Sequence, residues 1–149
     1  MRTSYIRPIF VDFIPDHLEE GKLYVSEQYH TAIHKCCCGC GEEVVTPLSP
    51  VDWRLIKGAK GVSLHPSIGN WNYPCRSHYF IRNNAVVWAA QMSQQEIKRV
   101  QRRDLQDKQR YIAYLNSTPM EGSKQPPRGL TFTGLLKIIW HNVKLFFGK

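Results

Sequence analysis

The stretch "HKCCCGCGEEVV", residues 34–45, holds four of the chain's five cysteines within five positions. Adjacent cysteines make strained disulfides, and thiols two positions apart in a strand are poorly placed to form a bridge. Glycines at positions 39 and 41 allow backbone conformations that bring successive side chains to one centre. The cluster therefore favours a metal site over a disulfide knot.

A zinc site needs four nitrogen or sulfur ligands in a tetrahedron. Cys36, Cys38 and Cys40 alternate and share one parity, whereas Cys37 has the opposite parity and is the spare thiol. The fourth ligand is Cys75 in "PCRSH", where His78 could replace one of the thiolates. A site closed by protein ligands is typical of structural zinc. The alternative, buried reduced thiols without a metal, explains so dense a cluster poorly.

The chain has 149 residues, which suits one domain with an appendage. No apolar run reaches the roughly 20 residues that span a membrane. The N-terminal stretch has Pro8 and Asp12 inside its apolar part and does not resemble a secretory signal. Clustered cysteines that bind metal are usual in a reducing compartment, so we expect a cytoplasmic protein.

The net charge of +8 is concentrated in the C-terminal part of the chain. Residues 1–92 carry nine Lys/Arg and eight Asp/Glu, a balance of +1; residues 93–149 carry eleven and four, a balance of +7. Aromatic residues join the basic run only at Tyr111 and Tyr114, so no base-stacking platform is evident. The pattern indicates a solvated helix face rather than a nucleic-acid site.

Residues 1–92 have the pattern of a small β-rich domain. Short apolar runs lie at 22–26 and 42–48, and two hairpins are predicted at 53–65 and 78–90, the second turning at Asn83 and Asn84. No helix of ordinary length is predicted there. The fold class is therefore α+β, a zinc-stabilised β-rich domain made of hairpins and followed by C-terminal helices.

The C-terminal part begins with the clearest helix, residues 93–116. Ser93 and Glu96 form a capping box, and Asp104 and Lys108 have the spacing of an i,i+4 ion pair. Residues 117–133 are a linker, and residues 134–149 are a short apolar helix. That helix needs burial against the body, against a second copy or, with its flanking lysines, on a membrane surface.

A second unusual stretch, "SLHPSIGNW", predicts a rigid, turn-rich segment. Ser67 lies between Pro66 and Gly69 and could act as a nucleophile. Main-chain N–H groups near Gly69, or the Asn70 amide, could receive an oxyanion. The base would be either His78 or His65, and Asp52 is the nearest acidic residue that could orient it. The alternative is that Ser67 caps a turn, His78 binds zinc and Trp71 packs.

The motifs "CCCGCGEEVV", "PLSP", "WRL", "SLHPSIGNW", "PCRSHYFI" and "VVWA" together resemble a bacterial family, the E-type peptidases of Bub operons. The resemblance covers about residues 20–90. Members occur in operons for ubiquitin-like conjugation, beside a ubiquitin-like modifier and E1-like and E2-like proteins. The family is thought to act as a serine peptidase that trims the modifier or removes it from its targets.

The resemblance implies that Ser67 is the nucleophile and His78 the base, with Gly69 and Asn70 in support. It implies an all-thiolate structural zinc site made by Cys36, Cys38, Cys40 and Cys75. It gives no role to His65 or Cys37. The implied partner is the C-terminal tail of a ubiquitin-like protein or its conjugates, together with E1-like and E2-like operon proteins. The rival hypothesis is a non-catalytic zinc-binding adaptor in the same pathway.

Overall fold

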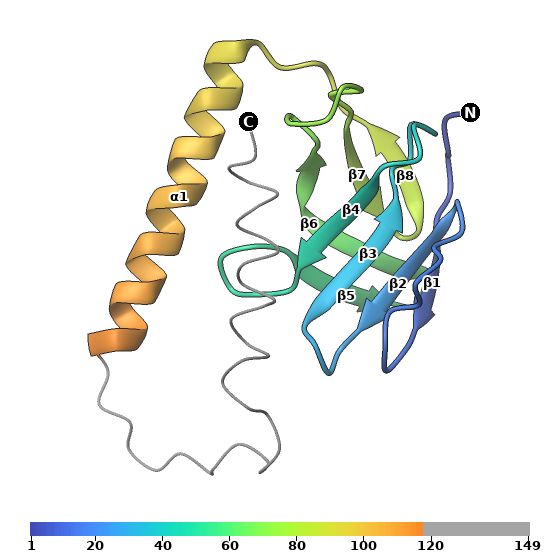
Figure 1. Ribbon diagram of the computed structural model, residues 1–149, viewed down its shortest axis with the longest axis horizontal. Helices are drawn as coiled ribbons and strands as arrows, with labels where there is room; N and C mark the ends of the chain where they lie inside the picture. Colours follow the sequence, from blue (N-terminus) through green and yellow to red (C-terminus); the bar gives the residue numbers. More distant parts are fainter. Residues whose placement is uncertain (118–149) are drawn as a thin grey trace. The chain divides into compact units, whose positions relative to one another are not determined.

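The computed structural model describes residues 1–117. By internal contacts the chain divides into two compact units, Met1–Leu115 and Asn116–Lys149, and every strand within the described residues belongs to the first. One sheet has the order β1(Arg7–Phe10), β2(Lys22–Ser26), β3(Thr31–Lys35), β4(Glu43–Pro47), and the other the order β5(Arg54–Gly58), β6(Gly61–Gly69), β7(His78–Arg82), β8(Ala85–Trp88). The helix α1(Gln94–Ser117) follows the strands, so the α+β class is confirmed (Figure 1).

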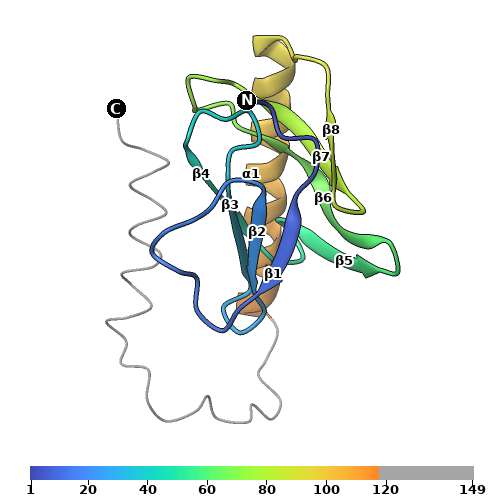
Figure 2. The ribbon, with the colours of Figure 1, turned by 90° about the vertical axis from the view of Figure 1, so that its right-hand side faces the viewer.

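The two sheets enclose one hydrophobic core (Figure 2). The second sheet is wholly antiparallel, whereas in the first sheet β1 runs parallel to β2. Leu23 and Val25 from the first sheet meet Ile68, Tyr79 and other side chains of the second in this core. The buried residues alternate along β6 and β7, as expected for strands with one covered face.

The N-terminal segment connects the sheets before β1 begins. Ile6 donates its N–H to the Asn84 carbonyl at 2.8 Å, and Val86 donates to the Ser4 carbonyl at 2.9 Å. The segment therefore covers the outer edge of β8. Ile6 is fully buried and anchors it in the core.

The predicted hairpins are present, β5–β6 and β7–β8. Asn83 and Asn84 turn the second hairpin with φ values of 48° and 68°, a conformation that asparagine tolerates. Asn84 also accepts the Val62 N–H at 2.8 Å through its side-chain oxygen. The same residue thus closes the turn and pairs with the neighbouring hairpin.

Three expectations about local structure need correction. The stretch around Ser67 is not a turn-rich loop but the end of the long strand β6, whose pairing with β7 is irregular between Leu64 and Ile68. The strands β1 and β3 were not predicted, because their sequences lack a clear alternating pattern or bounding turn signals. Lys108 binds Asp52 at 2.7 Å rather than Asp104, since the helix lies within reach of the loop before β5.

The capping box at the start of α1 is present. Glu96 accepts hydrogen bonds from the main-chain N–H and the hydroxyl of Ser93 at 2.8 and 2.7 Å. The apolar stripe of the helix is only partly used: Ile97 is buried, whereas Leu105 and Ile112 are each 57% exposed. The linker after position 117 and the helix at 134–149 lie outside the described residues.

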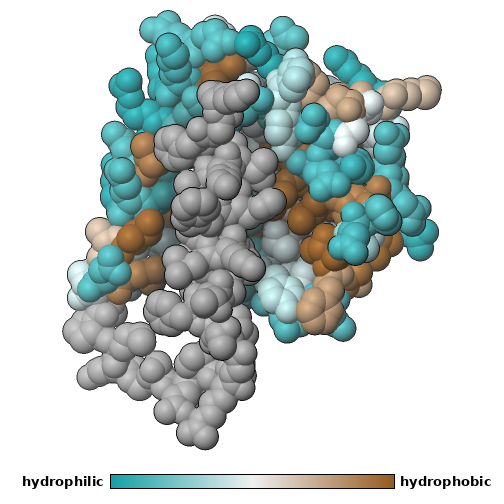
Figure 3. Space-filling model, viewed as in Figure 1, coloured by the Kyte–Doolittle hydropathy of each residue, from teal (hydrophilic) through white to brown (hydrophobic). Residues whose placement is uncertain are grey.

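A surface depression lies on the first sheet, lined by Phe10, Val11, Asp12, Val25, Glu27 and Gln28. Hydrophobic side chains gather on the β1–β2 side of the view in Figure 3. The depression includes neither Ser67 nor any cysteine. Among residues 1–117, no helix has the length and apolar character that crossing a membrane requires.

Candidate active site and metal centre

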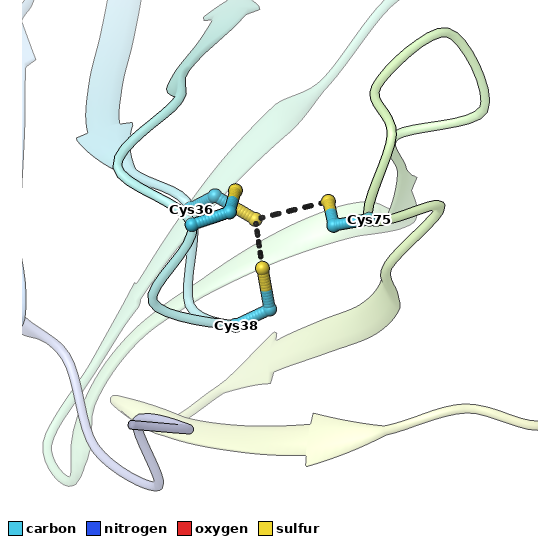
Figure 4. Close-up of side chains that lie close together, drawn as sticks. Cys36, Cys38 and Cys75 are labelled. Carbon is cyan, nitrogen blue, oxygen red and sulfur yellow. Dashed lines mark hydrogen bonds between the residues drawn. The ribbon is translucent and has the colours of Figure 1, made fainter.

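The cysteine cluster forms where a loop of the first sheet meets a loop of the second sheet. Cys36, Cys38 and Cys40 lie in the loop between β3 and β4, and Cys75 lies in the loop between β6 and β7. Figure 4 shows the sulfurs of Cys36, Cys38 and Cys75 turned toward one another from these loops. The four sulfurs all lie within 4.8 Å of one another.

Glycine makes the first loop possible. Gly39 and Gly41 adopt φ values of 81° and 84°, in the left-handed region that residues with a side chain rarely occupy. A Cβ atom at Gly39 would also collide with the main chain of Met1. The chain can therefore reverse direction tightly while its alternate thiols stay on one side.

The sulfur geometry fits a tetrahedral metal ion. Zn–S bonds of about 2.3 Å place neighbouring sulfurs about 3.8 Å apart. The observed separations are 3.4 Å between Cys36 and Cys38 and 3.9 Å between Cys36 and Cys75. Those distances exceed the roughly 2.05 Å of a disulfide bond, and all five cysteines are free thiols. The four cysteines could hold a metal ion.

The electrostatics of the cluster also call for a cation. Burial raises the pKa of Cys38 and Cys40. Burial acts in the same direction on Cys75, but hydrogen bonds with Ser77, Cys38 and Cys40 together outweigh it and bring the pKa of Cys75 down to about 7. Four thiolates at such short range repel one another, so a metal ion is needed to hold them all ionised.

Cys37 points away from this group and packs in the core. It is 2% exposed, and burial raises the pKa of its thiol to about 12. It is therefore a neutral core thiol, in agreement with its opposite parity in the sequence. Its packing partners include the buried Tyr79.

Two polar residues support the cluster, and sequence analysis did not predict this role for them. Ser77 is buried, and its Oγ lies 3.2 Å from Cys36 Sγ. The Asn70 side-chain nitrogen donates to Ser77 Oγ at 2.8 Å and to Cys36 Sγ at 3.5 Å. The Asn70 amide is thus directed at the cysteines. The only sequence signal was proximity: Asn70 follows the nucleophile motif and Ser77 lies two positions after Cys75.

Ser67 and His78 meet on the face of the second sheet that points away from the hydrophobic core. Ser67 lies near the end of β6, and His78 begins β7. Gly69 is the direct cross-strand partner of His78, which places Ser67 diagonally opposite the imidazole. The distance between Ser67 Oγ and His78 Nε2 is 3.0 Å.

The second ring nitrogen fixes the tautomer of His78. His78 Nδ1 lies 3.1 Å from the carbonyl oxygen of Ala90, an atom that can only accept a hydrogen bond. Nδ1 therefore carries the proton, and Nε2 has a lone pair that accepts the Ser67 hydroxyl. The Trp71 indole packs at a steep angle against the imidazole, with 4.9 Å between the ring centroids. The imidazole is held from three sides.

This arrangement leaves His78 outside the metal group. Both of its ring nitrogens are engaged elsewhere, and the four cysteines form the set without it. His65 is exposed and has no hydrogen bond with Ser67 among the described residues. Asp52 accepts the hydroxyl of Ser49 at 2.7 Å and binds Lys108, so it does not orient His78. The main-chain carbonyl of Ala90 orients the imidazole, a role for which an acidic side chain was expected. Because every residue has such a carbonyl, no side-chain pattern in the sequence could have revealed this partner.

Comparison with known protein families gave a match. The model of the family described as "Bacterial ubiquitination-like system serine protease (BubE)" matches residues 10–89. This match covers more than half of the chain and includes the four clustered cysteines as well as Ser67 and His78. The chain belongs to the BubE family. No match was found among curated proteins or among solved structures.

Proposed function

We propose that this BubE-family chain is a serine peptidase or esterase that cleaves the acyl bond at the C-terminal tail of a ubiquitin-like protein. The observation that carries the proposal is the 3.0 Å contact between Ser67 Oγ and His78 Nε2, with the imidazole oriented by the Ala90 carbonyl. A hydroxyl beside an oriented neutral imidazole is the arrangement that nucleophilic acyl transfer requires.

The proposed reaction has two acyl-transfer steps. His78 Nε2 takes the Ser67 hydroxyl proton while Oγ bonds to the substrate's carbonyl carbon. The tetrahedral intermediate then expels the leaving amine or alkoxide, which takes the proton from His78. Water, deprotonated by the same nitrogen, attacks the acyl group on Ser67. The bond between the carbonyl carbon and Ser67 Oγ then breaks, Oγ takes the proton back from His78, and the free carboxylate leaves. A main-chain N–H near Gly69 is the proposed oxyanion donor, since the Asn70 amide is directed at the cysteines.

The metal is proposed to be zinc with a structural role. Four thiolates close a tetrahedral zinc to substrate, so the ion would supply a cross-link between loops rather than a reaction centre. Cys36, Cys38, Cys40 and Cys75 would hold it. The proposed setting is the cytoplasm, where the thiols stay reduced, beside E1-like and E2-like operon partners.

Changing Ser67→Ala tests the proposal. Hydrolysis of 4-nitrophenyl acetate should fall by about 10³-fold or more, because no other described hydroxyl lies against His78. Ser63→Ala is the matched control: Ser63 lies in the same strand but only accepts the Asn83 N–H. Metal content and the circular dichroism spectrum should be unchanged in both variants. Activity retained in Ser67→Ala would reject Ser67 as the nucleophile, whereas an absence of turnover in the wild type would favour the adaptor hypothesis.

A further inference from the structure

The strand that carries Ser67 is longer than its neighbour. β5 pairs with β6 only from Gly58↔Gly61 to Arg54↔His65. Before Arg54 the chain turns toward the first sheet, where the Trp53 N–H donates to the Pro47 carbonyl at 3.1 Å. Residues 66–69 of β6 therefore have no strand beside them on the β5 side within the part of the chain that the structure describes (Figure 1).

The main chain at this open edge is oriented for pairing. The Asn70 N–H donates to the Ser77 carbonyl at 2.9 Å, so this pair is a hydrogen-bonded pair. Such pairs alternate with non-hydrogen-bonded ones along antiparallel strands. Gly69 therefore directs its N–H and carbonyl away from β7, toward the open edge. Pro66 is exposed, and Ser67 and Gly69 are half-buried.

An aromatic ring limits the space above the edge. A Cβ atom at Gly69 would overlap the Trp71 indole, so this ring lies directly over the Gly69 backbone. The same ring contacts His78. A residue paired with Gly69 on a neighbouring strand would direct its side chain to the same face of the sheet as this ring. Beside Trp71, only a small side chain fits easily.

We infer that residues 66–69 bind the substrate tail as an added antiparallel strand, with a glycine or alanine beside Trp71. The bound tail would continue the line of β5 and bring its scissile carbonyl to Ser67, which belongs to the same strand. The cleavage chemistry in this inference rests on the proposed function, but the binding mode does not. The occupant is an extended peptide with small residues near its C-terminal end, recognised through main-chain hydrogen bonds.

Binding can be measured without catalysis. The Ser67→Ala variant would be titrated with a fluorescein-labelled hexapeptide carboxamide ending in Gly-Gly-Gly, and with versions N-methylated at each position in turn. In an added strand only every second N–H faces β6. N-methylation should therefore weaken binding by about tenfold or more at alternate positions and little at the others. No binding, or an equal effect at all positions, would overturn the inference.

A second experiment tests the role of Trp71. The peptide residue that pairs with Gly69 is the third from the end when the last carbonyl lies at Ser67. Replacing this glycine with leucine should weaken binding to Ser67→Ala by about tenfold or more, and adding Trp71→Ala should remove most of that preference. Val87→Ala, on the same face of the sheet in β8, is the control and should keep it. If all three proteins preferred glycine over leucine equally, Trp71 would not be the residue that selects a small side chain. Hydrolysis of 4-nitrophenyl acetate by the wild type reports separately on the proposed function.

Discussion

Asn70 and Ser77 lie between the cysteine cluster and the proposed catalytic pair. Each is the chain neighbour of a residue on the opposite face of the second sheet: Asn70 follows Gly69, and Ser77 precedes His78. Their side chains bond to each other and to Cys36, on the side away from Ser67. The two adjacent strand ends are thus tied together by a polar contact that also touches the metal ligands.

Changing Asn70→Ala should weaken metal binding by about 10–100-fold, the usual effect of removing an outer-shell partner. It should also lower the free energy of unfolding by about 1–3 kcal/mol, because Ser77 loses a buried hydrogen-bond partner. A chelator titration and a urea unfolding curve would measure the two effects. Asn72→Ala changes an exposed asparagine of the same loop and should alter neither. Unchanged metal affinity in Asn70→Ala would show that Asn70 does not support the metal site.

Asp52 provides a residue-level test of the proposed catalytic arrangement. Because it binds Lys108 and Ser49 rather than His78, Asp52→Asn should leave 4-nitrophenyl acetate hydrolysis within about twofold of wild type. Steady-state kinetics at several pH values would show this. A loss of about 10³-fold or more would mean that an acid does orient the imidazole in solution.

At the scale of elements, α1 depends on its cap because it buries little surface. Ile97 is its one buried side chain, near the capping box. Packing therefore holds the beginning of the helix, and the later turns depend more on helix propensity. The basic residues along it include Lys98, Arg99 and Arg110, and their exposure agrees with the solvated face that the sequence predicted.

Ser93→Ala should increase amide hydrogen exchange in the first turn of α1, since two of the contacts at the cap are lost. The Ser93 hydrogen bonds lower the pKa of Glu96 below its ordinary value of 4.5. The stabilisation of the cap by ionised Glu96 is therefore present above pH 4.5 and is lost as the pH falls through the lowered pKa. Exchange of these amides, corrected for intrinsic rates, should therefore rise in acid in the wild type. The strands β2 and β3 serve as the internal reference, and equal protection in both proteins would contradict the cap's role.

At the scale of the whole molecule, the cysteine cluster joins the two sheets at one end. The first three ligands follow β3 of one sheet, and Cys75 precedes β7 of the other. The N-terminal segment makes a second connection through its bonds to residues 84 and 86. A metal ion would thus hold in place the strand ends that carry Ser67 and His78.

Removing the metal should lower the melting temperature and activity together, because the loops lose their cross-link. Chelation followed by thermal unfolding and 4-nitrophenyl acetate assays would measure this. Cys75→Ser should reproduce the effect, whereas Cys37→Ala should keep full metal content despite a modest loss of core packing. Activity surviving chelation with an unchanged melting temperature would contradict a structural metal.

The sequence by itself determined the features that depend on neighbouring residues. The Asn83–Asn84 turn, the Ser93–Glu96 cap and the parity of the cysteines follow from local backbone geometry, and each is present. The tertiary structure decided what depends on distant partners. Cys75 reaches the cluster because the two sheets pack together. Asp52 meets Lys108 because α1 lies near the loop before β5, and the Ala90 carbonyl meets His78 through the pairing of β7 with β8. Main-chain groups and open strand edges leave no signal in side-chain patterns, so the orientation of His78 and the free edge of β6 emerged only from the folded chain.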